Sequence, residues 1–400
     1  FPAGGATVAG RPIALYAAAV PPVYLDYNAT TPVDAGVLDA MRRVLESDFG
    51  NPSSVHWHGR RARALLDDCR ERVSSVLRCK PSEIVFTSGA TESNNLALLG
   101  SARRLQTRGR HLVTSAIEHP AVLEALRHLA AHDGFSLTEV APDAEGCVRI
   151  EAVETALQPD TVLVSLQAAN NEIGTLQPAA AVGALCRERG ICFHSDAVQW
   201  FGKEPLKGID CYNADLVSLS GHKIHGPKGA GLLFARSPRR LNRLMHGGSQ
   251  EDDLRPGTEN LAAIVGLTVA VERFVDPPVF DRTALAPLVS ALEGGLAQLP
   301  DVAVLGSQVP RVPNTVAFTA AGCDSLSLLA ALDLAGFAAS SGSACSAGAL
   351  QPSHVLRAMG VNNVLAAALV RLSLGRETSA AQIDRLLACL PAVIKQVRNA

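Results

Sequence analysis

The sequence of 400 residues lacks most of the features that mark specialised classes of protein. No window approaches the roughly 18 consecutive apolar residues of a transmembrane helix, which argues against a membrane protein. The nine cysteines include no C-x-x-C pair, which argues against a disulfide framework or a structural zinc site. A formal net charge of -2 gives no excess of basic charge, so nucleic acid and anionic membranes are poor candidate partners. The sequence therefore favours a small or neutral ligand.

The composition that remains is typical of a globular protein. Hydrophobic residues make up 48% and charged residues 18%, enough to bury a large core in roughly two or three domains. An odd number of scattered cysteines suits a reducing cytoplasm. Residues 1–22 are rich in Ala, Gly and Val, with Arg11 as their sole cation. We expect them to form an N-terminal extension, because a signal peptide would begin with a charged region.

From Val23 onward, short runs of β-forming residues alternate with amphipathic stretches, the signature of a sheet covered by helices. Several runs are apolar enough for burial on both faces, so we predict an α/β fold with a mainly parallel central sheet. The candidate strands are residues 83–88, 111–115, 161–168, 191–196, 215–220 and 229–235. The apolar spacing over residues 60–79 predicts a surface helix in which Cys69 is structural.

The pattern changes after about Pro277. Two short strands, residues 302–305 and 315–319, lie between helical stretches, and a third, residues 370–374, precedes the last helix. Ser379 and Gln382 form a candidate capping box at the start of that helix. We expect a second, smaller domain here, and we divide the chain into residues 1–33, 34–276 and 277–400.

A candidate anion site lies in residues 87–93, which follow a predicted strand and open a helix. Backbone N–H groups around Ala90 and the hydroxyl of Thr91 would face an anion at the helix N-terminus, where a phosphate fits. The alternative is a capped turn without a ligand.

Two charged residues follow other predicted strands. Lys223 follows Ser220 and His222 among small residues, a setting that suits a lysine that forms a Schiff base with a cofactor carbonyl. Asp196 ends a hydrophobic strand, where doubly wound sheets bind ligands and where a carboxylate could hold a pyridinium N–H. The alternatives are a solvated lysine and a turn aspartate.

A thiol and an imidazole complete the candidate chemistry. Cys345 lies in a segment of Gly, Ser and Ala that would present it on a mobile loop. Such mobility suits a nucleophile that reacts at one site and then transfers the bound group elsewhere. The alternative is an inert thiol, which is more common for a lone cysteine. His119 begins a helix, where its ring could stack on an aromatic group and exchange protons. The alternative for His119 is a capping histidine. We also weighed His194, His222 and His225 as metal ligands, but no carboxylate or thiolate stands at ligand spacing.

Together and in this order, these segments resemble the cysteine desulfurases of the NifS/IscS type, within the class V aminotransferase family of pyridoxal-phosphate enzymes. The resemblance covers nearly the whole chain after the extension. It also rests on short motifs elsewhere in the sequence, namely VYLDYNATTP at 23–32, GNPSS at 50–54, NNEIG at 170–174, RPGT at 255–258 and VRLSLG at 370–375. The sequence departs from the family at Asp252 and Asp253, where members more often have a basic or small residue.

The resemblance implies fold type I of the pyridoxal-phosphate-dependent transferases, with a mainly parallel seven-stranded sheet in a large domain, a smaller α+β domain, and a homodimer. It implies Lys223 as the Schiff-base lysine, Asp196 as the partner of the pyridine nitrogen, and His119 as the stacking group. It implies Gln199 as a donor to the ring hydroxyl. The implied phosphate ligands are Ala90, Thr91, Ser220 and His222, with Thr258 from the other subunit. Asn171, also counted among the cofactor ligands, and Arg371 would hold the substrate carboxylate.

The implied reaction takes sulfur from L-cysteine. Lys223 removes the α-proton, and the thiolate of Cys345 attacks the substrate sulfur, which leaves a persulfide on the enzyme and alanine as product. The persulfide would pass to an acceptor or scaffold protein for iron–sulfur clusters or another sulfur-containing product. The alternatives are selenocysteine lyase, another class V lyase or aminotransferase, and a non-catalytic protein that kept the fold as a scaffold.

Overall fold

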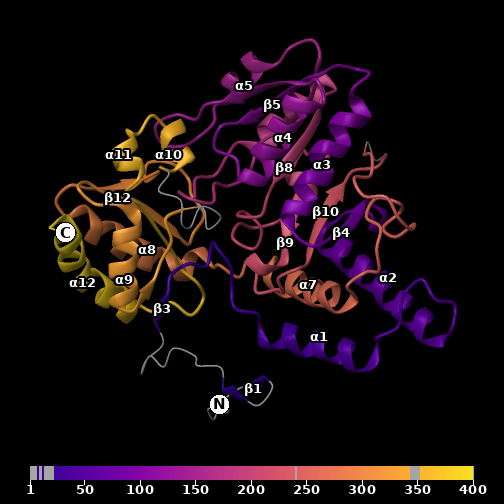
Figure 1. Cartoon of the computed structure of the whole chain (residues 1–400), viewed down its shortest axis with the longest axis horizontal. Coiled ribbons are helices and arrows are strands. Elements are labelled where there is room, and N and C mark those ends of the chain that lie inside the picture. Colours follow the sequence, from indigo (N-terminus) through magenta and orange to yellow (C-terminus); the bar gives the residue numbers. More distant parts are fainter. Residues whose placement is uncertain (1–6, 9–10, 13–21, 239–240, 343–351, 400) are drawn as a thin grey trace.

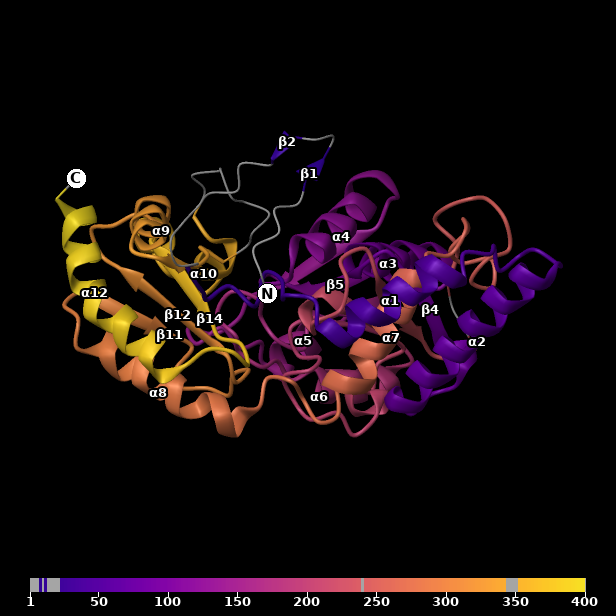
Figure 2. The same ribbon diagram turned by 90° about the horizontal axis from the view of Figure 1, so that it is seen from below.

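The computed structural model describes residues 7–8, 11–12, 22–238, 241–342 and 352–399. Figure 1 shows two groups of elements side by side, a large sheet with its helices and a smaller sheet formed mainly by the C-terminal third of the chain. Figure 2 shows the same two groups at opposite ends of an elongated molecule. The predicted extension therefore falls almost entirely outside the described residues.

The large sheet has seven strands in the order β4-β10-β9-β8-β7-β5-β6, which confirms the predicted fold class. Strand β10 runs antiparallel to both of its neighbours, and all other strand pairs in this sheet are parallel. The strands are β4 (Ile84–Thr87), β5 (His111–Ser115), β6 (Ser136–Val140), β7 (Thr161–Ser165), β8 (Cys192–Asp196), β9 (Leu216–Ser220) and β10 (Gly231–Ala235). All but β6 are buried along their whole length, as expected for a sheet with helices on both faces.

The helices cover the two faces of this sheet because side chains alternate along each strand. On β8, Phe193 belongs to the core cluster that includes residues of α1, α2, α6 and α7, whereas Cys192 belongs to the cluster that includes residues of α3 and α4. The helices of the large group are α1 (Ala35–Ser47), α2 (Trp57–Leu77), α3 (Ala90–Leu105), α4 (Pro120–His132), α5 (Ile150–Ala156), α6 (Ala179–Arg189) and α7 (Leu261–Phe274). Short 3₁₀ turns are η1 (Pro81–Glu83), η2 (Ile209–Tyr212) and η3 (Gly221–Lys223).

The smaller sheet has the order β11-β12-β14 and is antiparallel. Beside it, β13 pairs in parallel with β3, which joins an early segment of the chain to its C-terminal third. These elements are β3 (Val23–Tyr24), α8 (Arg282–Ala297), β11 (Val302–Leu305), β12 (Thr315–Ala320), α9 (Ser325–Leu334), β13 (Phe337–Ala338), α10 (His354–Ala358), α11 (Asn363–Ala366), β14 (Leu369–Ser373) and α12 (Ala380–Arg398). A separate ribbon joins β1 (Thr7–Val8) and β2 (Arg11–Pro12).

Most predicted elements are present, with shifted ends. The capping box of Ser379 and Gln382 opens α12 as predicted, and Cys69 is fully buried in α2. The strand predicted over residues 161–168 is too long, since β7 ends at Ser165. Strand β6 was missed because it is a half-exposed edge strand with polar residues. The division into domains stays a prediction. It is supported by a core cluster that joins Leu25 and Tyr27 to residues of α8, α9 and α12, whereas α10 and α11 contribute to the core of the large group.

Candidate active site

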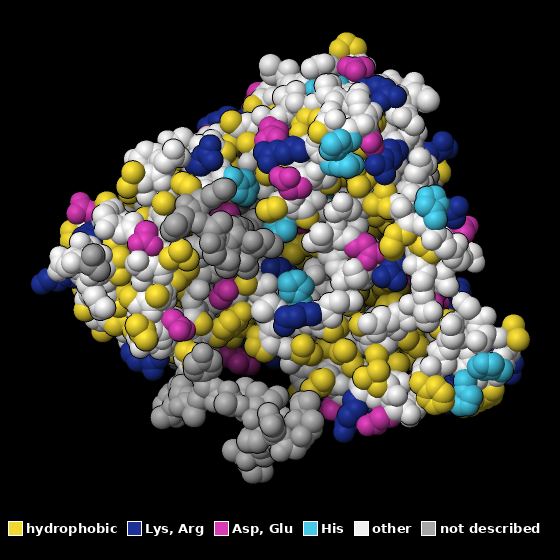
Figure 3. Space-filling model, viewed as in Figure 1, with side chains coloured by type: hydrophobic (Ala, Val, Ile, Leu, Met, Phe, Trp, Pro, Cys, Tyr) yellow, Lys and Arg dark blue, Asp and Glu magenta, His cyan; other side chains and the backbone are white. Residues whose placement is uncertain are grey.

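A cavity of about 600 Å³ opens at the carboxyl ends of β8 and β9. In the space-filling view, histidine and basic side chains gather in the hollowed centre of this face (Figure 3). Predicted site residues from distant parts of the chain line the cavity together, namely Ala90, Thr91, His119, Asn171, Asp196, Gln199, Ser220, His222, Lys223 and Arg371. Thr258 is exposed and does not line the cavity. Cys345 lies outside the described residues.

Lys223 reaches the cavity because η3 begins directly after β9. Its Nζ donates to the backbone oxygens of Asn28 and Ala29, the second at 2.9 Å. The amine is therefore held by two carbonyls on the segment that follows β3. Next to it, burial together with repulsion from Lys223 and Lys228 lowers the pKa of His222 to about 4, so this imidazole is neutral near pH 7.

Asp196 ends β8 and is nearly buried. Its Oδ2 accepts from Asn94 Nδ2 at 2.7 Å, and its Oδ1 accepts from the backbone N–H of Val198 at 3.0 Å. Two donors therefore fix the carboxylate at the cavity wall. Asn94 was missed by the sequence analysis, although it lies on the helix that follows the predicted anion turn.

His119 is the N-cap of α4 and is thus a capping histidine as well as a cavity residue. Its Nδ1 accepts from the backbone N–H of Ala121 at 3.1 Å. Burial is the main cause that lowers the pKa of His119, so the ring is neutral near pH 7. Because Nδ1 is the acceptor, the neutral ring carries its proton on Nε2.

The helix α3 begins without a side-chain cap, and its first residues, Ala90 and Thr91, line the cavity. An uncapped first turn leaves N–H groups available for an anion. Two glycines keep this end of the cavity open. A Cβ at Gly89 (φ 155°) or Gly229 (φ 79°) would meet no atom within 4 Å, and both residues line the cavity.

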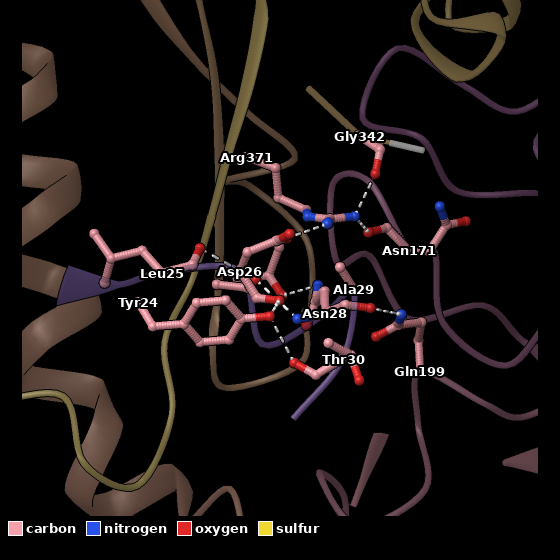
Figure 4. A network of polar contacts seen from close by, with 12 residues as sticks. Tyr24, Leu25, Asp26, Asn28, Ala29, Thr30, Asn171, Gln199, Gly342 and Arg371 are labelled. Carbon is pink, nitrogen blue, oxygen red and sulfur yellow. Dashed lines mark hydrogen bonds and ion pairs between the residues drawn. The ribbon is translucent and has the colours of Figure 1, made fainter. Parts of the chain in front are cut away.

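Arg371 enters from β14 on the other side of the cavity and is only 2% exposed. Figure 4 shows its guanidinium between three partners. Nη1 donates to the backbone oxygens of Asn171 (2.7 Å) and Gly342 (2.5 Å), and Nη2 pairs with Asp26 Oδ1 at 2.6 Å. Within the described part of the chain, Arg371 Nε and Asn171 Oδ1 are buried without a hydrogen-bond partner. This end of the cavity thus has a rigid guanidinium with an unused donor.

Gln199 lines the cavity beside Asn28, a residue for which the sequence analysis gave no role. Gln199 Nε2 donates to the backbone oxygen of Asn28 at 2.9 Å, and Gln199 Oε1 accepts from Lys203 at 2.6 Å. The signal for Asn28 was its place in the motif at 23–32, but the sequence could not show which residues it would contact.

Two buried carboxyl groups lie close to the cavity. Burial raises the pKa of Glu118 to about 8, although its Oε1 accepts from the backbone N–H of Gln167 (2.7 Å) and from Ser115 Oγ (3.0 Å). Burial also raises the pKa of Glu172. Glu172 Oε2 accepts from Ser353 Oγ at 2.5 Å. Burial therefore shifts the equilibrium of both acids toward the protonated form in the folded protein.

Among the described residues, no helix is long and apolar enough to cross a membrane. The same residues contain no group of three or more His, Cys, Asp or Glu side chains that could hold a metal ion.

Comparison with known proteins identifies the family of this chain. The model of the class-V aminotransferases matches residues 23–386. The chain belongs to the class-V aminotransferase family. Within it, the chain is 41% identical to a cysteine desulfurase IscS of Dictyoglomus turgidum, over 94% of this chain and 95% of the relative. It is 42% identical to a cysteine desulfurase IscS of Pectobacterium atrosepticum, over 94% of both chains.

Solved structures of the family have the same fold. A NifS-like protein, 36% identical, superposes with a TM-score of 0.87 over 94% of this chain and 100% of that one. A NifS-like protein from Rickettsia africae, 31% identical, gives a TM-score of 0.83 over 94% and 99%. The sequence resemblance to the cysteine desulfurases is thus confirmed.

Proposed function

We propose that this protein is a pyridoxal-phosphate-dependent cysteine desulfurase. The reaction converts L-cysteine and the thiol of Cys345 into L-alanine and a persulfide on Cys345, with the substrate C–S bond broken and an S–S bond formed. The observation that carries the proposal is that one cavity is lined by Lys223, Asp196 and Arg371, which the fold brings together from β9, β8 and β14.

The described residues fit the cofactor. Its phosphate suits the open end of the cavity, where Gly89 and Gly229 leave space and where α3 begins uncapped beside Ser220 and His222. Its pyridine nitrogen suits the fixed carboxylate of Asp196. When bound, pyridoxal phosphate acts as an electron sink that acidifies the α-carbon of an amino acid.

Lys223 holds the cofactor and moves the α-proton. Its Nζ lies against the oxygens of Asn28 and Ala29, which keep the amine at the cavity wall and within reach of a substrate. His119 would stack on the cofactor ring and present the proton on Nε2, since Nδ1 accepts from the backbone N–H of Ala121 in α4. Gln199 presents its remaining N–H to the ring hydroxyl.

Arg371 and Asn171 bind the substrate carboxylate. The pairing of Arg371 with Asp26 and with two backbone oxygens holds the guanidinium in one orientation, so little freedom is lost when the substrate binds. The buried and unpaired Nε offers a donor for the carboxylate. The substrate is thereby oriented with its α-carbon toward Lys223, and the thiol of Cys345 attacks its sulfur.

The experiment that tests this function measures sulfide and alanine released from L-cysteine, with reductant, by the purified yellow protein. The variant Cys345→Ala should stay yellow and lose both products. Cys147→Ala is the control, because Cys147 is a half-buried free thiol with a raised pKa, for which burial is the main cause. A yellow parent that makes no sulfide would overturn the proposal and direct the test to selenocysteine and to transamination substrates.

A homodimer is part of this proposal. Phe49, Val55 and Trp57 are 71%, 87% and 56% exposed around the connection from α1 to α2. Figure 3 shows hydrophobic and histidine side chains gathered at the lower right of this face, over that connection. Exposed apolar patches of this kind mark interaction sites. In the dimer, Thr258 would reach the cofactor phosphate of the partner subunit. Sedimentation of an active, cofactor-replete monomer would contradict the dimer.

We also propose that Cys345 passes its sulfur to an acceptor protein for iron–sulfur clusters or another sulfur-containing cofactor. The setting would be the cytoplasm, where reducing conditions keep thiols free. None of the eight cysteines within the described ranges is in a disulfide bond. Neither nucleic acid nor a membrane is required as a direct partner, in line with the balanced net charge.

A further inference from the structure

Lys203 is a buried amine to which the proposed mechanism gives no role. The residue is 1% exposed and lies in the turn between β8 and η2. Lysine is almost never fully buried unless its head group is bound, because an ammonium loses its hydration there. Burial, followed by repulsion from Lys223 and Arg371, lowers the pKa of Lys203 well below its ordinary value. The fold therefore places a second amine beside the lysine of the site.

The head group of Lys203 contacts two side-chain amides. Its Nζ donates to Gln199 Oε1 and to Asn28 Oδ1, both at 2.6 Å. It also lies 5.3 Å from the centre of the ring of Phe280, which is fully buried. The two amide oxygens are the acceptors that a buried amine needs, and the ring closes the third side.

The hydrogen bond from Lys203 to Gln199 sets the orientation of the Gln199 side-chain amide. Because Oε1 accepts from Lys203, the amide nitrogen lies on the opposite side, where it donates to the backbone oxygen of Asn28 and borders the cavity. A rotated amide would direct Oε1 at that carbonyl oxygen, and the two acceptors would repel each other. Lys203 thus favours the orientation in which Gln199 is a donor.

The second contact fixes Asn28, which joins three parts of the molecule. Asn28 Oδ1 also accepts from Asn314 (3.1 Å), and Asn28 Nδ2 donates to Thr315 Oγ1 (2.8 Å) on β12. The backbone oxygen of Asn28 accepts from Lys223 Nζ and from Gln199. Figure 4 shows Asn28 and Gln199 side by side in this network. Lys203 is therefore joined to Lys223 through a single residue.

We propose that Lys203 is a positioning residue that holds Gln199 as a hydrogen-bond donor to the cofactor and holds Asn28 as the acceptor for Lys223. The inference rests on the proposed function, since it takes the cavity as the cofactor site. Its consequence is spectroscopic, because the donor at the ring oxygen and the partner of the lysine amine both set the protonation of the bound chromophore.

The test compares the yellow holoenzyme with its Lys203→Met variant, which keeps an unbranched apolar stem as far as Cε and removes the amine with its donors. Lys207→Met is the matched control, since Lys207 is exposed four residues away. Absorbance of the bound cofactor is followed from pH 6 to pH 10, together with the midpoint of thermal unfolding. We expect the spectral pH midpoint of Lys203→Met to shift by about one unit, because the free energy of one lost hydrogen bond corresponds to a pKa shift of about that size. Lys207→Met should keep the parent midpoint.

A double variant separates positioning from a general loss of stability. If Lys203 acts on the chromophore partly through Gln199, the shift caused by Lys203→Met should be smaller in a Gln199→Ala background than in the parent. A lower unfolding midpoint with an unchanged spectral pH midpoint would make Lys203 merely structural and overturn the inference. Equal shifts in both backgrounds would overturn the part assigned to Gln199.

Two further outcomes are distinguishable. Should Lys203→Met fail to fold, Lys203→Gln takes its place, because its amide keeps an N–H donor at nearly the same reach, and we expect a smaller shift in the same direction. A parent that binds cofactor but releases no sulfide would overturn the proposed function while the spectral titration still decides the role of Lys203. A parent that binds no cofactor would overturn both.

Discussion

Arg371 and Asp26 form an ion pair of 2.6 Å across 345 residues of sequence, at the cavity wall that faces Lys223. The side chain of Arg371 is 2% exposed, whereas that of Asp26 is 19% exposed. The carboxylate therefore compensates a guanidinium that is almost removed from water. It also leaves Nε of Arg371 without a partner among the residues that the structure describes.

Asp26→Asn should weaken substrate binding. The substitution removes the charge partner of Arg371, so we expect the KM for L-cysteine to rise about tenfold, with a smaller change in kcat, because Arg371 would lose its fixed orientation. Steady-state sulfide release measures both constants. Asp39→Asn is the control, since the pair of Asp39 and Arg42 lies on the surface with both side chains more than half exposed. An unchanged KM in Asp26→Asn would exclude this role for Asp26.

Glu118→Gln should change how stability depends on pH. The pKa of Glu118 is raised from 4.5 to about 8 in the folded protein, mainly by burial. The folded state then keeps a proton that the unfolded state releases, so the contribution of Glu118 to stability is full below pH 4.5 and is lost as the pH rises to about 8. We expect the parent to lose stability relative to Glu118→Gln across this window, by at most about 1.4 kcal/mol per pH unit. Urea unfolding at pH 5, 7 and 8.5 measures the difference, which would stay constant if Glu118 titrated normally.

His194 should act in the acid range with the opposite sign. Burial lowers its pKa from 6.5 to about 4, and its two ring nitrogens bond to Ser165 Oγ (2.8 Å) and Ser218 Oγ (3.0 Å). Between these two pKa values the unfolded state binds a proton that the folded state does not bind. The contribution of His194 to stability is therefore present above pH 6.5 and is lost as the pH falls to about 4. We expect His194→Gln to be less stable than the parent at pH 8, with a gap that narrows toward pH 4.5. Thermal unfolding over that range tests the change, and a gap that widens on acidification would contradict it.

Glu251→Ala should destabilise the segment that follows β10. The carboxylate of Glu251 is 1% exposed, and it accepts from Arg70 on α2 through both oxygens, at 2.5 and 3.0 Å. It also accepts from the backbone N–H of Phe86 in β4 at 2.8 Å. Removal of one partner of a buried pair costs about 3–5 kcal/mol. Denaturant unfolding measures the loss, with the exposed Glu188→Ala as control, and a loss below about 1 kcal/mol would show that the pair is not important.

The central sheet and part of the site could be predicted from the sequence because both depend on local patterns. Continuous apolar runs mark buried parallel strands, and the residue that ends such a strand lies at the edge where these sheets bind ligands. Asp196 and Lys223 were found in this way. The glycine and small residues at the start of α3 indicated the anion site in the same way, because they follow a predicted strand and open a helix. Strand β6 escaped because an exposed edge strand carries no apolar run.

The sequence by itself thus determined the buried strands of the large sheet and which side chains follow the ends of those strands. Only the tertiary structure decided which of those side chains meet. Asp26, Asn171 and Arg371 come from three distant segments, and no periodicity encodes their contact. Lys203 is one charged residue in a turn until packing against Phe280 removes its water and leaves Asn28 and Gln199 as acceptors. Local patterns follow from the geometry of the backbone, whereas such contacts follow from how segments distant in sequence pack together in three dimensions.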